Sequence, residues 1–408
     1  MGTCGARAVY EQYKRCVEGT LIVQRPAVTA VLTAAALVLA VGCSSGGEDA
    51  PDNRKSPSER GRQSESPTGK PGAQPPPEKG SAKVTRTLAT GLASPWGLAA
   101  LPGGDLLVSS RDEGTITRVD GTTGKKTELG SVPGVSPGGE GGLMGLALSP
   151  SYASDHMVYA YFTTESDNRI ARMLYDEKKP AGEQLGAPDT IFKGIPKGMI
   201  HNGGRIAFGP DKMLYAGAGE TGDTDLAQDK KSLGGKILRL TPDGEPAPGN
   251  PFADSPVYSL GHRNVQGLAW DEQKRLWASE FGQDTWDELN EIKAGENYGW
   301  PKAEGKAGEE GFRDPLAQWK TSEASPSGIA YAEGSVWMAG LRGERLWRIP
   351  VRDVEGEPKP QSFLKGEYGR LRTVLAAGGD KLWLVTNETD SRGTPEKDDD
   401  KILEVEVE

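Results

Sequence analysis

The chain has 408 residues, a net charge of −10 at neutral pH and only three cysteines. An acidic balance argues against a nucleic-acid surface, which requires clustered basic residues. The cysteines, Cys4, Cys16 and Cys43, all precede the bulk of the chain. The part that follows them therefore has no disulfide framework, no cysteine-ligated zinc and no thiol nucleophile. Its stability must come from a hydrophobic core.

The N-terminal segment has the features of an export signal. An apolar run, 27–41, follows Arg25 and ends next to a small residue and Cys43. A basic flank, a short apolar core and small residues before a cleavage point are typical of secretory signals. Cys43 resembles the acylated cysteine of a bacterial lipobox, although Ala40 stands where leucine is usual; an ordinary signal peptide is the alternative. The long polar stretch 1–21 suggests that translation starts further downstream.

Residues 44–82 are rich in Ser, Gly, Pro, Lys and Glu and contain almost no large apolar residue. Such a segment cannot bury enough surface to offset the entropy lost on ordering the chain. We therefore predict a signal peptide at 1–43, a disordered linker at 44–82 and a folded domain at 83–408. This arrangement predicts an extracytoplasmic protein, secreted or attached to the membrane only through an N-terminal lipid anchor.

One pattern recurs along the folded part: a small residue, an apolar pair, a turn, a second apolar pair, another turn and a third apolar strand. The spacing of roughly 40–60 residues is typical of propeller blades. Apolar residues alternate or cluster around Gly-Asp, Pro-Asp and Gly-Gly turns, as antiparallel strands require. The pattern predicts an all-β protein, a six-bladed β-propeller of four-stranded antiparallel blades. The copies begin at Pro95, Gly142, Gly204, Gln266, Pro326 and Arg370.

The ring of blades should be closed by its two ends. A strand near Lys83–Leu88 and the last strand, 402–407, are expected to lie in one blade, which removes exposed sheet edges. Loops around the central channel are then the expected ligand site. The chain contains no Rossmann fingerprint, phosphate-binding loop, GxSxG elbow or HExxH motif.

Polar side chains precede two of the predicted first strands. His201 lies beside flexible glycines, where it could act as a general base near neutral pH. A structural role is the alternative for a lone histidine. Arg263 supplies a planar fork suited to carboxylates, and Asn264 supplies both a donor and an acceptor. A hydrogen-bond network that locks the blade is the alternative there.

Two further groups carry candidate ligands. The oxygen-rich loop 280–288 contains a glycine turn and suits Ca²⁺, although it lacks the EF-hand pattern and could be a solvated acidic turn. Arg370 and Arg372 have the i, i+2 spacing that places strand side chains on one face. Together with Arg342 they could bind a polyanionic small molecule, the alternative being exposed strand arginines. The acidic run 398–400 is expected to be solvated.

These segments, in this order, resemble the soluble quinoprotein glucose dehydrogenases and the related aldose sugar dehydrogenases. The resemblance extends from about Leu88 to the C-terminus, and LGHRN followed by NYGWP is its most specific part. The motifs are SPWGLA at Ser94, GEGGLMGLALSP at Gly139, HNGGRIAFGPD at His201, GGKILRL at Gly234, LGHRNVQGLAW at Leu260 and NYGWP at Asn297.

The resemblance implies a propeller that carries pyrroloquinoline quinone (PQQ) and Ca²⁺ and oxidises aldoses at C1 to lactones. His201 matches the base that takes the C1 hydroxyl proton while hydride passes to the quinone. Glu140 falls where the glucose enzymes have a polar residue near the sugar. The cofactor-binding positions match Arg263, Asn264, Arg342, Arg370 and Arg372. The carbonyls of Gly282 and Gln283 match ligands of the catalytic Ca²⁺, and Glu288 and Tyr298 match ligands of a structural Ca²⁺.

The chain also departs from the family pattern. Arg342 replaces a frequent lysine, Ile200 replaces an acidic neighbour of the base in the glucose enzymes, and Gln283 replaces a proline. The loops between blades are short, which suggests an open site, loose substrate choice and a monomer. The expected partners are an aldose and an artificial or respiratory electron acceptor. A non-catalytic propeller that binds carbohydrate or protein, and a Ca²⁺-dependent propeller lactonase, are the competing hypotheses.

Overall fold

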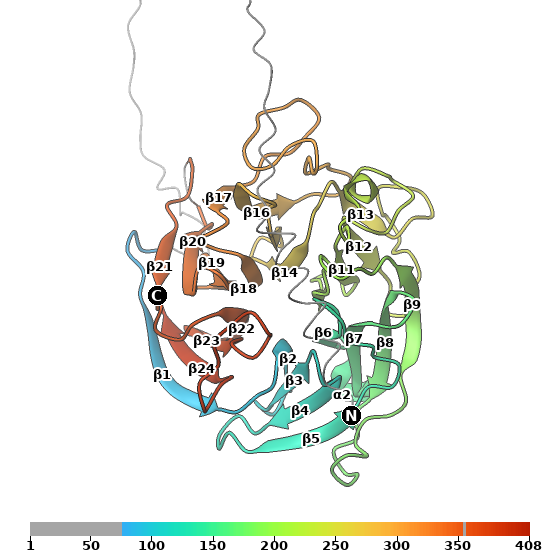
Figure 1. Cartoon of the computed structure of the whole chain (residues 1–408), viewed down its shortest axis with the longest axis vertical. Coiled ribbons are helices and arrows are strands. Elements are labelled where there is room, and N and C mark those ends of the chain that lie inside the picture. Colours follow the sequence, from blue (N-terminus) through green and yellow to red (C-terminus); the bar gives the residue numbers. More distant parts are fainter. Residues whose placement is uncertain (1–75, 354–355) are drawn as a thin grey trace, which may run out of the picture. The chain divides into compact units, whose positions relative to one another are not determined.

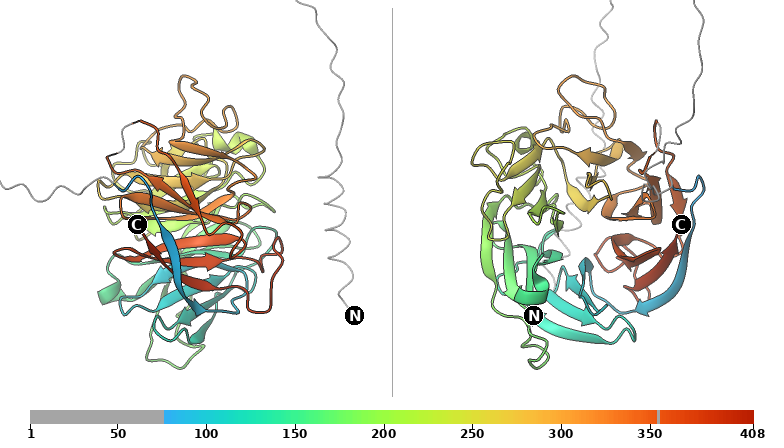
Figure 2. Two further views of the ribbon diagram at one scale, coloured as in Figure 1. Left: turned by 90° about the vertical axis from the view of Figure 1, so that its left-hand side faces the viewer. Right: turned by 180° about the vertical axis from the view of Figure 1, so that it is seen from behind.

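The structure, a computed structural model, describes residues 76–353 and 356–408. In these residues six four-stranded antiparallel sheets surround a central axis (Figure 1). Figure 2 shows the same ring from the side and from behind. The predicted six-bladed propeller is confirmed, and each predicted repeat begins within two residues of an innermost strand. The predicted signal peptide, with Cys43, and most of the predicted linker lie outside the described residues.

The blades follow one another along the chain. The first contains β2 (Pro95–Ala100), β3 (Leu106–Ser110), β4 (Thr115–Val119) and β5 (Lys126–Ser131). The second contains β6 (Leu143–Leu148), β7 (Met157–Thr163), β8 (Asn168–Leu174) and β9 (Asp189–Ile195). The third contains β10 (Ile206–Phe208), β11 (Leu214–Ala218), β12 (Lys236–Leu240) and β13 (Val257–Leu260).

The remaining blades have the same order. The fourth contains β14 (Val265–Trp270), β15 (Leu276–Glu280), β16 (Trp286–Ile292) and β17 (Ala317–Lys320). The fifth contains β18 (Pro326–Ala332), β19 (Ser335–Gly340), β20 (Arg345–Pro350) and β21 (Gln361–Phe363). The sixth contains β22 (Leu371–Gly378), β23 (Lys381–Thr386), β24 (Ile402–Val407) and β1 (Ala82–Ala89).

The sixth blade closes the ring as predicted. Its outermost strand, β1, comes from the start of the described chain and pairs antiparallel with β24, with Ala82 opposite Val407. This pairing joins the two ends of the described chain within one sheet. The ring is therefore closed by backbone hydrogen bonds, and β24 is not left as an exposed edge strand. Apolar side chains then fill the space between neighbouring blades; one cluster joins Trp337 of β19 to Leu384 of β23 and Leu403 of β24.

The innermost strands approach one another closely at the axis. A Cβ atom on Gly97 of β2 would lie 2.4 Å from the carbonyl oxygen of Met144, and one on Gly145 of β6 would lie 2.3 Å from that of Gly204. Only glycine permits such contacts. Most of these strands also carry a register shift near their first residues, as between Pro95 and Leu98. Bulges of this kind redirect side chains at the rim of a site.

Among the described residues, helical structure is limited to α2 (Tyr152–Asp155) and the 3₁₀ turn η1 (Thr224–Ala227). No helix in this part of the chain is long and apolar enough to span a membrane. The loops of the third blade are instead held by a buried lysine. Lys236 is fully buried, and its ammonium donates hydrogen bonds to the carbonyls of Leu226 (2.6 Å), Ala227 (3.0 Å) and Gly234 (2.7 Å).

We predict that Lys236→Met lowers the free energy of unfolding by about 2 kcal/mol or more, because each buried carbonyl that loses its donor costs about 1–3 kcal/mol. Denaturant unfolding of the two proteins measures the difference. Lys231→Met is the matched control, since Lys231 is exposed and its ammonium forms no hydrogen bond or ion pair with other described residues. Equal unfolding free energies for the Lys236 variant and the control would contradict the prediction.

Candidate active site

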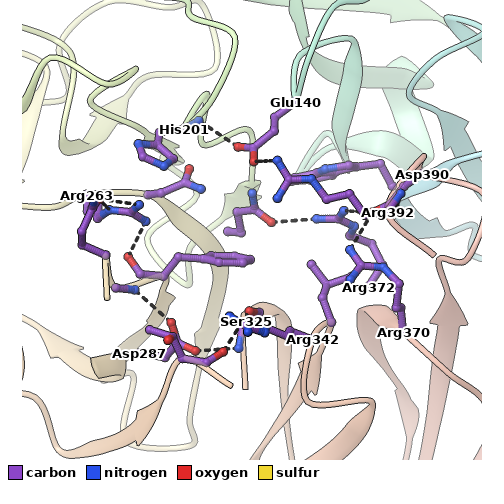
Figure 3. Close-up of a pocket in the computed structure, with 18 of the residues that line it drawn as sticks. Glu140, His201, Arg263, Asp287, Ser325, Arg342, Arg370, Arg372, Asp390 and Arg392 are labelled. Atoms are coloured by element: carbon purple, nitrogen blue, oxygen red, sulfur yellow. Dashed lines mark hydrogen bonds and ion pairs between the residues drawn. The ribbon is translucent and has the colours of Figure 1, made fainter. Parts of the chain in front are cut away.

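A cavity of about 340 Å³ lies at the axis (Figure 3). Trp96 of β2, Gln266 of β14 and Arg372 of β22 line its wall. Its charged lining comprises six arginines and three carboxylates, and His201 lies among them. With the histidine neutral these groups sum to +3, in a chain whose net charge is −10. Such a cavity suits a ligand with several negative charges. The charged residues are Arg111, Glu140, Arg263, Asp287, Arg342, Arg370, Arg372, Asp390 and Arg392.

His201 is held by a buried carboxylate that sequence reasoning did not identify. Its Nδ1 lies 2.6 Å from Oε1 of Glu220, a residue that is only 1% exposed and follows β11. The other carboxylate oxygen accepts the backbone N–H of Gly222. Because an ionised carboxylate only accepts hydrogen bonds, we assign the ring proton to Nδ1. His201 lines the cavity, and this tautomer leaves Nε2 as a proton acceptor.

The backbone of His201 is fixed as well. The residue has a φ of 53°, a left-handed conformation that non-glycine residues seldom adopt. Its N–H donates to Oε2 of Glu140 at 2.8 Å, and its carbonyl accepts the N–H of Thr221 at 3.1 Å. A Cβ on Gly219 would lie 1.9 Å from that carbonyl. The base candidate is therefore positioned from its main chain as well as its ring.

Arg263 and Asn264 line the same cavity on the side of the fourth blade. The guanidinium of Arg263 donates to the side-chain oxygen of Gln283 at 2.9 Å and to the carbonyl of Phe281 at 3.3 Å. Burial lowers its pKa, although nearby carboxylates oppose that shift. Asn264 accepts the N–H of Gly203 at 3.0 Å, which links it to the turn after His201. Both side chains therefore line the cavity and are held in place by hydrogen bonds to neighbouring residues.

His262, by contrast, belongs to a closed network. Its Nδ1 lies 2.8 Å from Oε2 of Glu280, and its Nε2 lies 2.8 Å from Oγ of Ser259. Its ring stacks on Tyr298 at 4.7 Å between centroids, and the residue is fully buried. The other oxygen of Glu280 accepts the N–H of Arg263. The blade-locking alternative therefore holds for His262, whereas Arg263 and Asn264 reach the cavity.

Arg370 and Arg372 converge on one carboxylate. Their Nη2 atoms donate to Oδ2 of Asp390 at 2.9 and 3.0 Å. Arg372 also donates to Asn387 and Gln266, each at 2.8 Å. Burial lowers the pKa of Arg372 to about 9. Burial alone would raise the pKa of Asp390, but Arg372 and then Arg370 lower it below its usual value. The expectation that the two arginines face one side is confirmed.

The β23–β24 loop, residues 387–401, carries Asp390 and is anchored by a second aspartate. Asp400 is fully buried. Its Oδ1 accepts the N–H of Glu388 at 2.6 Å, and its Oδ2 accepts the N–H of Thr389 at 3.1 Å. The expectation that 398–400 is solvated is therefore wrong for Asp400, because unpaired backbone donors of its own loop require a buried acceptor.

An ion pair spans the mouth of the cavity. Oε1 of Glu140 lies 2.7 Å from Nη2 of Arg392, so a loop of the second blade meets the β23–β24 loop (Figure 3). The other oxygen of Glu140 holds the backbone of His201. Arg342 lies at the opposite part of the lining and is exposed. Glu140 therefore couples the rim of the cavity to the base candidate.

The predicted Ca²⁺ ligands fall in two places. Gly282 and Gln283 line the main cavity, and none of the described residues donates a hydrogen bond to their carbonyl oxygens. Glu288 and Tyr298 line a second, much smaller cavity of about 10 Å³, together with Glu280 and Glu304. Its size suits a single ion. No group of three or more His, Cys, Asp or Glu side chains within the described ranges is arranged to hold a metal, so both places depend on backbone carbonyls.

The structure thus brings most of the predicted site residues together and adds others. His201, Arg263, Asn264, Arg342, Arg370, Arg372, Glu140, Gly282 and Gln283 all line one cavity. The residues that sequence reasoning missed include Glu220, Asp390 and Arg392. Glu220 follows a strand at a position analogous to Glu280, and that repeat relation could have identified it. Asp390 and Arg392 lie in a polar loop without any such signal.

The axial cavity holds a carboxylate-bound histidine among arginines, so a general base and a polyanionic cofactor could share it. The family model described as "Glucose / Sorbosone dehydrogenase" matches residues 92–394. The chain therefore belongs to the glucose/sorbosone dehydrogenase family, the PQQ-dependent sugar dehydrogenases that its motifs resemble, and is an oxidoreductase.

Individual relatives agree with this family. The structure of the PQQ-bound aldose sugar dehydrogenase from Streptomyces coelicolor is similar with a TM-score of 0.81 and 79% identity, over 82% of this chain and 100% of that chain. Aldose sugar dehydrogenase YliI from Escherichia coli is 30% identical over 71% of this chain and 80% of that protein. Quinoprotein glucose dehydrogenase B from Acinetobacter calcoaceticus is 28% identical over 61% of this chain and 59% of that protein.

We predict that Asp390→Asn lowers the free energy of unfolding by about 3 kcal/mol at pH 7, because it leaves two buried guanidinium groups without their carboxylate. The pKa of Asp390 is lowered from 3.8 on folding, so its stabilising contribution is complete above that value and is lost as the pH falls through the lower folded pKa. The difference between the proteins should therefore narrow below pH 3.8.

Denaturant unfolding across this pH range measures the effect. Asp398→Asn is the control, because Asp398 lies in the same loop with an exposed side chain. A constant difference at all pH values, or none at pH 7, would contradict the assignment of Asp390 as the shared counter-ion.

Proposed function

We propose that this protein oxidises aldose sugars at C1 to lactones, with PQQ as the bound oxidant and Ca²⁺ beside it. The observation that carries the proposal is the His201–Glu220 pair, which presents a proton acceptor to an arginine-lined cavity. An aldose and a respiratory or artificial electron acceptor are the partners that this chemistry requires. The S. coelicolor structure is a PQQ-bound form and the A. calcoaceticus relative is a quinoprotein, which supports the choice of a quinone cofactor.

His201 acts as the general base in this proposal. Its Nε2 takes the proton of the C1 hydroxyl, and the carboxylate of Glu220, 2.6 Å from Nδ1, stabilises the imidazolium that forms. Position 200 is Ile200, which cannot orient the imidazole through a carboxylate. Glu220 supplies that carboxylate instead. When bound, PQQ supplies an electrophilic quinone that accepts the hydride from C1, so that the sugar loses two electrons and becomes the lactone.

The lining fits a tricarboxylate such as PQQ. Arg370 and Arg372 would hold its carboxylates, since guanidinium groups bind carboxylates in a planar, bidentate manner. Arg342 forms no ion pair with another described residue, so its charge is available to the ligand. Arg263 and Asn264, which line the same cavity as His201, would bind further polar groups of the cofactor.

Ca²⁺ fits both predicted places. The carbonyls of Gly282 and Gln283 face no donor from the described residues, and Ca²⁺ accepts backbone oxygens readily. There it would act as a Lewis acid beside the quinone. In the smaller cavity, burial and the neighbouring Glu280 raise the pKa of Glu288 to about 8. Glu288 accepts hydrogen bonds only from neutral groups, the amide of Asn290 and the N–H of Gly305, so its carboxylate would be a ligand of a structural Ca²⁺.

The N-terminal sequence and the short loops between blades support two further proposals. We propose an extracytoplasmic protein, lipid-anchored through Cys43 or secreted, and a monomer. The competing hypotheses are a non-catalytic binding propeller and a Ca²⁺-dependent lactonase. A lactonase would require side-chain carboxylates around a channel metal, whereas the arginine-rich lining favours a polyanionic cofactor.

The first test is reconstitution of the purified protein with PQQ and Ca²⁺, followed by dye reduction with a panel of aldoses. We predict turnover that requires PQQ and that falls about 100- to 10,000-fold in His201→Asn. Glu220→Gln should fall by at least about tenfold while still binding PQQ. Asparagine tolerates the positive φ of His201. His156→Asn is the matched control, because His156 has a φ of 52°, is exposed and does not line the cavity.

Turnover that survives in His201→Asn would remove the base from the proposal, and failure to bind PQQ would remove the cofactor and favour the binding propeller.

The second test is metal removal. We predict that a chelator abolishes dye reduction and lowers the midpoint of thermal unfolding, and that added Ca²⁺ restores both. Glu288→Gln should reduce the stabilising effect of Ca²⁺, because it removes one of the three carboxylates that line the smaller cavity. Glu309→Gln, at an exposed position outside both cavities, is the control. Thermal unfolding that is independent of Ca²⁺ in the wild type would overturn the structural Ca²⁺ assignment.

A further inference from the structure

Arg205 is a buried cation just below the cavity, and the mechanism above does not use it. It precedes β10 and is 8% exposed, yet it does not line the cavity. Its Nε donates to the carbonyl of Gln266 at 2.8 Å, and its Nη2 donates to Oγ1 of Thr373 at 3.1 Å. Its guanidinium lies over the ring of Trp96, 4.4 Å from the centroid. Arg205 therefore contacts the innermost strands of the first, fourth and sixth blades.

No carboxylate compensates this charge. The ion pairs found among the described residues do not include Arg205, and its hydrogen-bond acceptors are neutral. An uncompensated buried cation is costly, and a side chain that served only to join the blades could have been neutral. The pKa of Arg205 is lowered to about 9 by burial and then by Arg372. The neighbouring charge thus increases the cost instead of offsetting it.

The contacts of Arg205 lead directly to the cavity wall. Trp96 lines the cavity, and Arg372 also lies over its ring, at 5.8 Å from the centroid. Gln266 accepts from Arg205 through its backbone carbonyl and from Arg372 through its side chain. Thr373, the other acceptor of Arg205, directly follows Arg372 in β22 and donates to the carbonyl of Trp96 at 2.6 Å. The buried cation is therefore one residue layer away from any ligand in the cavity.

We propose that Arg205 is a cofactor-positioning residue: from beneath Trp96, its uncompensated charge strengthens the binding of the polyanionic quinone without touching it. The inference rests on the proposed function, because it requires PQQ as the ligand. A positive charge in a site of low dielectric constant attracts an anion across several ångströms, since water does not screen it there. The binding of a tricarboxylate would in turn supply the negative charge that the chain does not place next to Arg205.

The test is the dissociation constant of PQQ, measured by equilibrium dialysis in the presence of Ca²⁺ and without sugar. Arg205→Gln and Arg205→Met remove the charge, whereas Arg205→Lys keeps it and loses the forked hydrogen bonds. We expect the neutral variants to bind PQQ about tenfold more weakly or worse, and the lysine variant to stay within about threefold of the wild type.

Arg348→Gln is the matched control. Arg348 is also fully buried and bonded to neutral groups, the side chain of Gln361 and the carbonyl of Pro77, but it lies outside the cavity. It should lower the midpoint of thermal unfolding and leave the dissociation constant of PQQ unchanged.

The outcomes separate the two levels of the proposal. If the wild type does not bind PQQ, the proposed function fails, and this inference fails with it. If the wild type binds PQQ and the lysine variant is weakened as much as the glutamine variant, Arg205 acts through its hydrogen bonds and the electrostatic role is overturned. Should Arg205→Gln fail to fold, the comparison of Arg205→Met with Arg205→Lys gives the same decision.

Discussion

The concentration of positively charged arginines at the axis of the propeller is the constraint that determines the other interactions of the site. Arg370 and Arg372 share the single carboxylate group of Asp390, and Arg372 is additionally bonded to neutral oxygens. Asp390 is kept in place because Asp400 accepts the backbone N–H groups of the same loop. The positive charge that remains is not neutralised by the chain. A polyanion that binds there relieves the repulsion among these cations, and this relief contributes to its binding free energy.

The ring geometry makes this concentration possible. Six innermost strands meet at one axis, so side chains from blades far apart in sequence lie within bonding distance. Arg205 of the third blade reaches Thr373 of the sixth, a separation of 168 residues. Glycines such as Gly97 and Gly145 let the strands approach each other at main-chain contact distance. The closing pair of β1 and β24 then holds the ring at this diameter.

How much could be predicted from the sequence depended on whether a residue belonged to the repeat. His201, Arg263 and Arg372 stand at or near the start of a first strand, so the blade pattern made them candidates for the channel and the family resemblance gave them roles there. Asp390 and Arg392 come from the β23–β24 loop, and only ring closure brings that loop to the cavity. The burial of Asp400 could not be predicted for a related reason. An acidic run in a polar loop appears solvated until the backbone donors around it are known.

The third and fourth blades contain the same device used in two ways. In each, a glutamate at the end of the second strand or just after it binds Nδ1 of a histidine that lies before a first strand. The pairs are Glu220 with His201 and Glu280 with His262. The second carboxylate oxygen of each glutamate accepts a backbone N–H. In the fourth blade, Ser259 occupies Nε2 of His262 and Tyr298 covers its ring, so the pair only stabilises the turn. In the third blade, His201 faces the cavity instead. The difference between a structural and a reactive histidine lies in what surrounds Nε2, because the carboxylate partner is common to both.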